Sequence, residues 1–302
     1  MAGVSLGTSR ARAAGSDENP KRSAEQELIL TGTKAALDKS LFPALRELAY
    51  PGHFVVVADG GGYGAENTWP GLDSWQMAGA YLLAGRQREV LDYFDFVEAS
   101  QRKDGNIPFA IFPGDQPPAG TNSWLRGLRF PEDVYIHPGH GLVDLHGLSD
   151  VNWAAIGFEI ATGRQREVLW PMLTNEPGFW RGGLPTHVVT KPDRYEAWEL
   201  SEPLPFRYTK FTQDVAAMGR VWYLEALACL AMKDDRRLRA SVVKVCETGK
   251  KTEWFWHERY HADGDAVKPA GVFRYCEYPA ILVRVVLGNP GIFPEAGELV
   301  YR

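Results

Sequence analysis

Three residues within one short segment, WPGLDSW, are of the types that bind sugars: Trp69, Asp73 and Trp75. An aromatic ring gives the apolar face of a sugar a flat surface, and a carboxylate accepts charge-assisted hydrogen bonds from its hydroxyl groups. Pro70 suits the first turn of a helix, so we expect this segment to stand at a helix start. The structural alternative is that Asp73 or Thr68 only caps that helix while the tryptophans pack in the core.

A cluster of histidines, His137, His140 and His146, lies beside Asp133 and Asp144 in the segment HPGHGLVDLH and the residues before it. Such a set could bind a metal, but its spacing follows no zinc pattern, and its proline and glycine favour a loop. We therefore expect no metal. Imidazoles could instead carry out acid–base chemistry of the kind that sugar epimerases perform.

Other common chemistries find no support in the sequence. The glycine-rich run 60–64 lacks the endings that cradle phosphates, and no G-x-S-x-G segment marks a serine nucleophile. The three cysteines, Cys229, Cys246 and Cys276, are widely spaced and suggest neither disulfides nor a metal clip. A reducing, cytoplasmic compartment and the absence of any cofactor are the resulting expectations.

The charge and hydropathy of the chain exclude two classes of partner. A net charge of −5 is far from the basic footprint of a nucleic-acid binder, and no uninterrupted apolar run reaches the roughly 18 residues that span a bilayer. Residues 1–22 are small, polar and charged, which predicts a disordered leader. Residues 23–302 are then expected to form a single domain.

Apolar segments with helical spacing alternate along the chain with charged, amphipathic ones. Those expected to be buried on every side are 70–84, 151–161, 215–232 and 280–287, and those expected to face solvent are 86–102, the segment from Arg164, and 236–257. The heptapeptide GRQREVL occurs from Gly85 and again from Gly163, two glycines expected to end buried helices. Residues 24–49 predict one kinked helix or two short ones, with a break near Pro43.

This alternation predicts an all-α fold in which inner helices touch the core and outer helices meet water. The expected architecture is an (α/α)6 toroid, or a shortened α/α barrel, with short β segments in its loops, one of them at 53–59. The long segments 103–148 and 174–211 are rich in proline, glycine and aromatic residues. Loops of such length in a compact domain are usually functional, so we expect them to build a binding cleft at one end.

Two motifs give the sequence a resemblance to a known superfamily. The run TWPGLDSW from Thr68, followed by a helix pair and the turn QRKDGNIP from Gln101, is similar to the opening of the six-hairpin (α/α)6 glycosidases. These include trehalases, glucoamylases and mannosylglycerate or glucosylglycerate hydrolases. The resemblance implies that Asp73, with Trp69 and Trp75, holds the terminal sugar.

The resemblance also implies two catalytic carboxylates, because glycoside hydrolysis generally uses a pair of them. The segment YEAWELSEP is similar in order to the acid-bearing loop of the family, although its G-x-D part is absent, so Glu199 and Glu202 are rival general acids. The segment RYCEYP is similar to the one that carries the base, which indicates Glu277. A solvated acidic loop remains the alternative for the first two, and a glutamate favoured by the helix dipole for Glu277.

Three further residues are candidates for substrate binding. Asp150, at the start of an apolar helix, is expected to point toward the mouth of the barrel, unless it is only a cap. Trp124 and Arg126 lie in the long loop and could contact a substrate that carries a carboxylate, although a surface loop explains them equally well.

The sequence thus predicts an inverting glycoside hydrolase that acts on a small glycoside or on the non-reducing end of an oligosaccharide. A sugar epimerase or isomerase, or a polysaccharide lyase, would use the same toroid with histidine or tyrosine chemistry. A carbohydrate-binding relic without turnover is a third alternative. An open ring completed by a second copy would make the protein a homo-oligomer.

Overall fold

The structure is a computed structural model of the 302-residue chain. It describes residues 22–45, 54–58, 74–101, 103, 105, 107, 148, 150–185, 216–263 and 266–299. This part of the chain is mostly helical and contains one three-stranded antiparallel sheet. None of its helices is long and apolar enough to cross a membrane.

The helices, in chain order, are α1 (Ala24–Ala35), the π-helix η1 (Ala36–Leu41), α2 (Phe42–Ala44), α3 (Ser74–Leu83), α4 (Gln87–Ala99), α6 (Asp150–Gly157), α7 (Gly163–Thr174), the 3₁₀-helix η3 (Pro177–Gly183), α8 (Gly219–Met232), α9 (Asp235–Lys250), α10 (Glu277–Gly288) and the 3₁₀-helix η5 (Pro294–Leu299). The strands are β1 (Ala217–Met218), β2 (His257–Asp263) and β3 (Ala266–Phe273). They pair antiparallel in the order β1-β2-β3.

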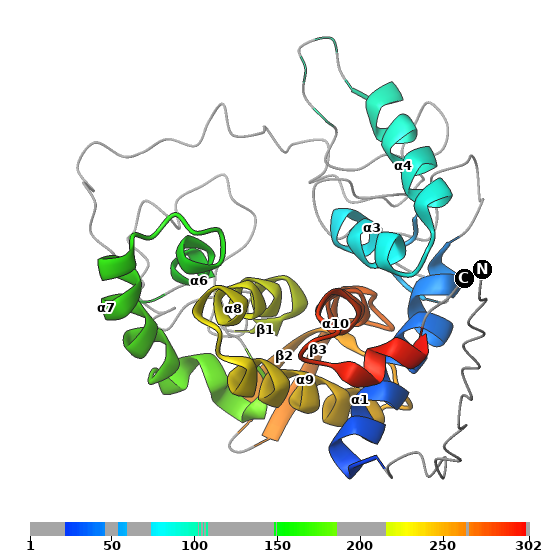
Figure 1. Cartoon of the computed structure of the whole chain (residues 1–302). Coiled ribbons are helices and arrows are strands. Elements are labelled where there is room, and N and C mark those ends of the chain that lie inside the picture. The colour runs from blue at the N-terminus through cyan, green and yellow to red at the C-terminus, as the bar shows by residue number, and fades with distance from the viewer. Residues whose placement is uncertain are drawn as a thin grey trace, which may run out of the picture.

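Four helices, α6, α8, α10 and α3, stand side by side in that order and form the inner row of an arc (Figure 1). The helices α7, α9, α1 and α4 lie on the outer side of this row. Glycines let the inner helices approach closely: a Cβ at Gly157 of α6 would lie 2.7 Å from the Leu227 Cβ of α8. The described helices therefore show the expected inner and outer layers, and α3 and α6 occupy the two ends of the arc.

The prediction that every apolar helix is enclosed is correct for α10, most of which is buried, and wrong for α3 and α6. Leu82 and Leu83 of α3 and Val151 of α6 are exposed. The physical reason is position, because a helix at the end of an arc has an inner neighbour on one side only. The sequence pattern indicates that a helix is apolar, but it does not indicate how many neighbouring helices cover it.

The repeated heptapeptide GRQREVL begins an outer helix in both copies, which confirms the predicted hairpins. Its first glycine plays different parts in the two copies. Gly85 follows α3 with a φ of 77°, where a residue without a Cβ is favoured. Gly163 was expected to end α6, and this expectation is wrong: α6 ends at Gly157, and Gly163 is the first residue of α7, capped by Thr162.

A break in the first helical segment was expected near Pro43, but the structure shows none before this proline. The chain stays helical from α1 through η1 to α2, with Pro43 inside the last short helix. Ser23 starts the segment with a capping box to Gln26. Residues 46–49 lie outside the described part.

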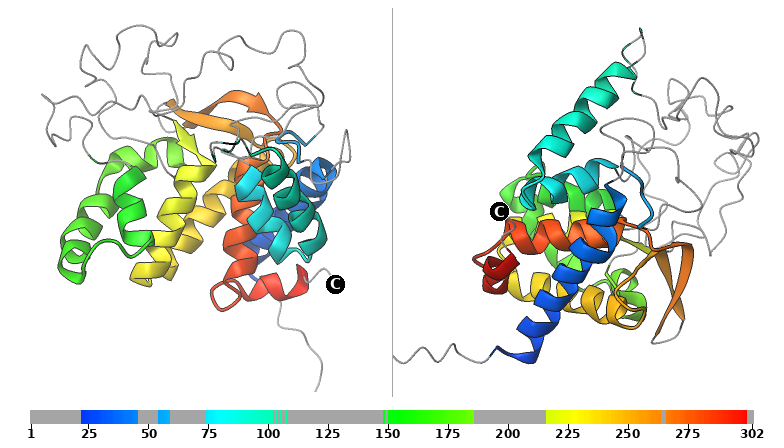
Figure 2. Two further views of the ribbon diagram at one scale, coloured as in Figure 1. Left: turned by 90° about the horizontal axis from the view of Figure 1, so that it is seen from above. Right: turned by 90° about the vertical axis from the view of Figure 1, so that its right-hand side faces the viewer.

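The sheet lies at the end of the arc where α8 and α10 begin (Figure 2). The sequence pattern missed it, since α9 was expected to continue to His257. The helix ends at Lys250, and Glu253 and Trp254 both take positive φ values, which no helix continues. The run 53–59 forms no strand in its described residues, where Phe54 and Val57 make isolated bridges to Leu45 and Tyr275.

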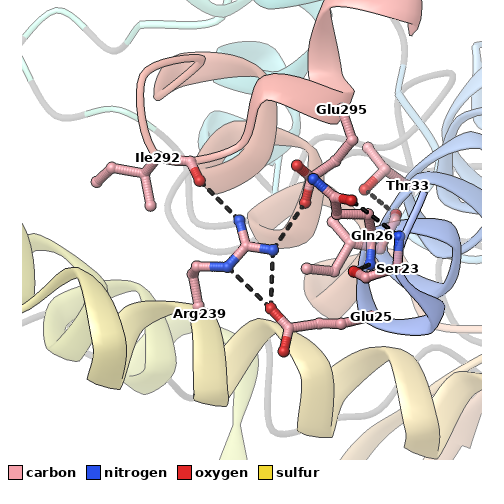
Figure 3. A network of polar contacts seen from close by, with 8 residues as sticks. Ser23, Glu25, Gln26, Thr33, Arg239, Ile292 and Glu295 are labelled. Atoms are coloured by element: carbon pink, nitrogen blue, oxygen red, sulfur yellow. Dashed lines mark hydrogen bonds and ion pairs between the residues drawn. The ribbon is translucent and has the colours of Figure 1, made fainter. Parts of the chain in front are cut away.

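An arginine of α9 joins helix α1 to the end of the described chain (Figure 3). The Nε of Arg239 donates to Glu25 of α1 over 2.9 Å, and its Nη1 donates to the carbonyl of Ile292 over 2.7 Å. Its Nη2 lies 3.2 Å from Glu295, whose side chain is buried. The first and last elements of the described chain, α1 and η5, are thereby held on one outer helix.

Candidate functional site

The candidate site centres on the place where α8 and α10 begin. Gly219, the first residue of α8, packs against Glu277, the first residue of α10: a Cβ at Gly219 would lie 2.9 Å from the Glu277 Cγ and 3.0 Å from the backbone nitrogen of Tyr278. The two helix starts are therefore in direct contact. β1 leads straight into α8, and Tyr275, which bridges to Val57, precedes α10, so the sheet and this bridge hold both starts in place.

The Glu277 carboxylate joins the two helices. Its Oε1 accepts a hydrogen bond from the backbone N–H of Arg220 over 2.5 Å, and the Arg220 guanidinium lies 3.7 Å away. At the start of neither α8 nor α10 does the side chain of the capping residue accept a hydrogen bond from the helix backbone. Glu277 thus supplies to α8 the cap that its own sequence lacks.

The electrostatics of this position favour a negatively charged group. The N-terminus of a helix carries about half a positive charge, and two such ends and one guanidinium meet at Glu277. The side chain is 0% exposed. The position therefore suits a carboxylate that acts as a base and equally suits one that only caps a helix.

An aromatic and cationic cluster lies on the same inner row, on helices α3, α8 and α10. Trp75, near the start of α3, is 44% exposed, and its ring meets the Tyr223 ring of α8 edge-on at 6.4 Å between centroids. The Arg284 guanidinium of α10 lies 4.0 Å from the Tyr223 centroid and 5.7 Å from that of Trp75. Three inner helices therefore contribute to one surface that combines flat rings with a positive charge.

Only three of the residues predicted for the site fall in the described part of the chain. Trp75 and Glu277 come from neighbouring helices of the inner row, and Asp150 begins α6 at the far end of that row. The other predicted residues lie outside the described residues: Glu199, Glu202, Trp69, Asp73, Trp124 and Arg126. The histidine cluster of 137–146 and the glycine-rich run 60–64 lie outside them as well.

Asp150 occupies a position typical of a helix start. Its Oδ1 accepts a hydrogen bond from the backbone N–H of Val151 over 3.0 Å. This is a local contact of the kind that favours aspartate at the beginning of helices. The contact fits the capping alternative, and Asp150 remains a prediction as a substrate-binding residue.

A second buried glutamate shows what a purely structural carboxylate looks like in this chain. Glu225 of α8 pairs with Arg237 of α9 at 2.7 Å, and the Arg237 guanidinium stacks between Trp153 and Trp180, 5.3 and 4.7 Å from their centroids. This pair ties the inner helix to its outer partner within a packed aromatic cluster. It serves below as a comparison for Glu277.

Sequence reasoning missed Arg220, Tyr223 and Arg284. A signal was present for the two arginines, because each is a single cation in an otherwise apolar helix, in VAAMGRVWYL and AILVRVVL. A charge there requires a partner or a ligand, since burying it unpaired is costly. Tyr223 carried no such signal, because aromatic residues are common in cores.

Metal and thiol chemistry have no visible site in the described residues. Among them, no group of three histidine, cysteine, aspartate or glutamate side chains is placed to hold a metal ion. Cys229, Cys246 and Cys276 are buried and unbonded to one another, and burial raises the pKa of the Cys229 thiol. A buried thiol of raised pKa is a poor nucleophile.

No known protein family, curated protein or solved structure matches this chain. The resemblance to six-hairpin glycosidases therefore rests on its sequence motifs.

Proposed function

We propose that this protein is a glycoside hydrolase of the (α/α)6 toroid type, which inverts the anomeric configuration of a small glycoside or of the non-reducing end of an oligosaccharide. The observation that carries the proposal is the carboxylate of Glu277, fixed where α8 and α10 meet, with Trp75 and Tyr223 on the same inner row. The order of inner and outer helices supports it, and the toroid itself is part of the proposal.

In this proposal Glu277 is the general base that activates water, and Glu202 or Glu199 is the general acid that protonates the leaving group. Trp75, with Trp69 and Asp73, holds the terminal sugar, and Asp150, Trp124 and Arg126 complete the binding surface. The mechanism requires that water reaches the Glu277 carboxylate, which is fully buried in the structure. The proposal therefore requires that this carboxylate become accessible to water when substrate binds.

The first test is turnover. Purified protein is incubated with a panel of aryl glycosides and natural disaccharides, and the anomer first released is identified by NMR. Hydrolysis with inversion is expected for at least one glycoside. A released sugar of retained configuration would contradict the inverting mechanism, and cleavage by elimination would indicate a lyase.

The second test separates catalysis from stability. Glu277→Gln is expected to lower turnover by about 10²-fold or more, because an amide cannot act as a general base. Glu225→Gln is the matched control, since it neutralises another buried glutamate of the inner row that also pairs with an arginine. It is expected to lower the melting temperature while leaving turnover within about two-fold.

Glu202→Gln and Glu199→Gln identify the acid, and one of the two is expected to lose activity. Turnover that survives Glu277→Gln and both of these substitutions would overturn the hydrolase proposal and favour an epimerase or a lyase. If no glycoside is turned over but a sugar raises the melting temperature, the protein is a carbohydrate-binding relic.

A further inference from the structure

Arg284 stands in an unusual place for an arginine. It lies within the apolar run AILVRVVL of α10, an inner helix whose other side chains are mostly buried. Its guanidinium packs against α3 so closely that a Cβ at Gly79 would lie 2.7 Å from the Arg284 Nε. A leucine or methionine would fill such a position without burying a charge.

Arg284 also differs from other part-buried arginines in its partner. Four of them pair with a glutamate: Arg220 with Glu277 at 3.7 Å, Arg237 with Glu225 at 2.7 Å, Arg239 with Glu295 at 3.2 Å, and Arg259 with Glu258 at 2.7 Å. Among the residues that the structure describes, no carboxylate pairs with Arg284. Its Nη2 donates to the Tyr223 hydroxyl over 2.6 Å, and its buried Nη1 finds no hydrogen-bond acceptor in the described part of the chain.

Burial of the Arg284 guanidinium carries a desolvation cost. Burial lowers the pKa of Arg284 from its ordinary value, which the neighbouring Tyr223 only partly offsets. Stacking of the guanidinium on Tyr223 and Trp75 is favourable, but a cation–π contact does not replace an anionic partner for a desolvated charge. An anion that reached this guanidinium would gain a charge-assisted and bidentate contact.

We infer that Arg284 binds an acidic group on the sugar, a carboxylate or a phosphate, while the exposed ring of Trp75 stacks on the sugar itself. The inference rests on the proposed function, because it treats this surface as part of a sugar site, and it narrows the substrate to acidic sugars. Tyr223 is a positioning residue, since its hydroxyl accepts from the Arg284 Nη2 and so fixes one edge of the guanidinium.

The inference is tested by binding to the full chain, measured by isothermal titration calorimetry with three probes: glucuronate, glucose 6-phosphate and glucose. At least one acidic probe is expected to bind about ten-fold or more tightly than glucose, as a charge-assisted hydrogen bond predicts. The tighter of the two acidic probes identifies the anion as carboxylate or phosphate. Equal binding of all three sugars would overturn the inference.

Substitutions test whether Arg284 causes the preference for an acidic sugar. Arg284→Met is expected to abolish the preference for the acidic probe over glucose. Arg88→Met is the control, because it removes the same charge from the exposed surface of α4, and it should keep the preference. If Arg284→Met does not fold, Arg284→Lys keeps the charge without the planar fork and should weaken the acidic probe measurably. A preference that persists in the folded variant would also overturn the inference.

Tyr223→Phe keeps the ring and removes only the hydroxyl. This variant is expected to weaken binding of the acidic probe less than Arg284→Met does. Low salt should restore part of the lost affinity, since the charge of Arg284 remains. The experiments distinguish a failure of the acidic-sugar site from a failure of the hydrolase proposal. An acidic sugar that binds through Arg284 but is never cleaved would refute the hydrolase, whereas cleavage of a neutral glycoside unaffected by Arg284→Met would refute the acidic-sugar site.

Discussion

At the scale of single residues, charged side chains in apolar helices carry most of the information about function, and their partners distinguish them. Glu225 and Glu277 are both buried in the inner row. Glu225 is neutralised by Arg237 between two tryptophans, whereas Glu277 holds together the starts of two helices. The sequence shows both as acids in apolar surroundings, and only their contacts distinguish the two positions.

The histidines of β2 make the stability depend on pH. Burial lowers the pKa of His257 from its ordinary value of 6.5, and burial together with Arg259 and Lys268 lowers that of His261. The unfolded chain therefore binds these protons at a higher pH than the folded chain. We therefore expect these two histidines to cost no stability above about pH 6.5 and to destabilise the fold as the pH drops through and below it.

We expect His257→Gln to reduce this loss of stability. The variant and the wild type are compared by urea unfolding at about pH 7.5 and about pH 5. Carboxylates contribute equally in both proteins, so the difference between the two pH dependences isolates His257. An identical decrease in both proteins would contradict the shifted pKa.

At the scale of elements, two glycines that begin helices test how α8 meets α10. Gly219→Ala is expected to lower the free energy of unfolding by about 1–3 kcal/mol, because its Cβ would press on the backbone of α10 near Tyr278, which cannot move alone. Gly163→Ala is the matched control, since Gly163 also begins a helix and a Cβ there meets nothing within 4 Å. Urea unfolding measures both, and an equal effect would show that the contact carries no strain.

The presence of the helices was largely predictable from the sequence, but the residues at which they end were not. Each apolar segment and its charged successor became a helix pair because the spacing of apolar residues reflects the helix period. The ends were set by backbone conformations that the pattern does not contain. Glu159 takes a left-handed φ after α6, and Glu253 does so after α9, although neither is a glycine.

At the scale of the whole molecule, the core is divided unequally along the arc. One large cluster joins α1, α3, α8, α9 and α10, while a smaller cluster around Trp153, Leu173 and Phe179 joins α6, α7 and η3 to α8. The smaller end also leaves apolar side chains in solvent, including Ile160 at 74% exposure. The α6–α7 end should therefore be the least stable part of the described arc.

Native-state hydrogen exchange measures this difference. Amides of α6 and α7 are expected to exchange through local opening, at lower free energy than amides of α8 and α10, which should exchange only on global unfolding. Substitution Trp153→Leu should enlarge the gap, because it loosens the smaller cluster in which Trp153 is central. Uniform protection across all four helices would show that the two clusters unfold as one unit.

The sequence by itself determined the helical class, the alternation of apolar and charged helices, and the positions of Trp75 and Glu277 at helix starts, because these follow from local periodicity and short motifs. The tertiary structure decided which helices are neighbours, and so brought Trp75 of α3, Tyr223 of α8 and Arg284 of α10 together from segments far apart in the chain. It also decided that a β-hairpin follows α9 and that α3 and α6 end an arc. Such features depend on contacts between distant residues, and a periodicity read along one segment contains no information about the segment that will pack against it.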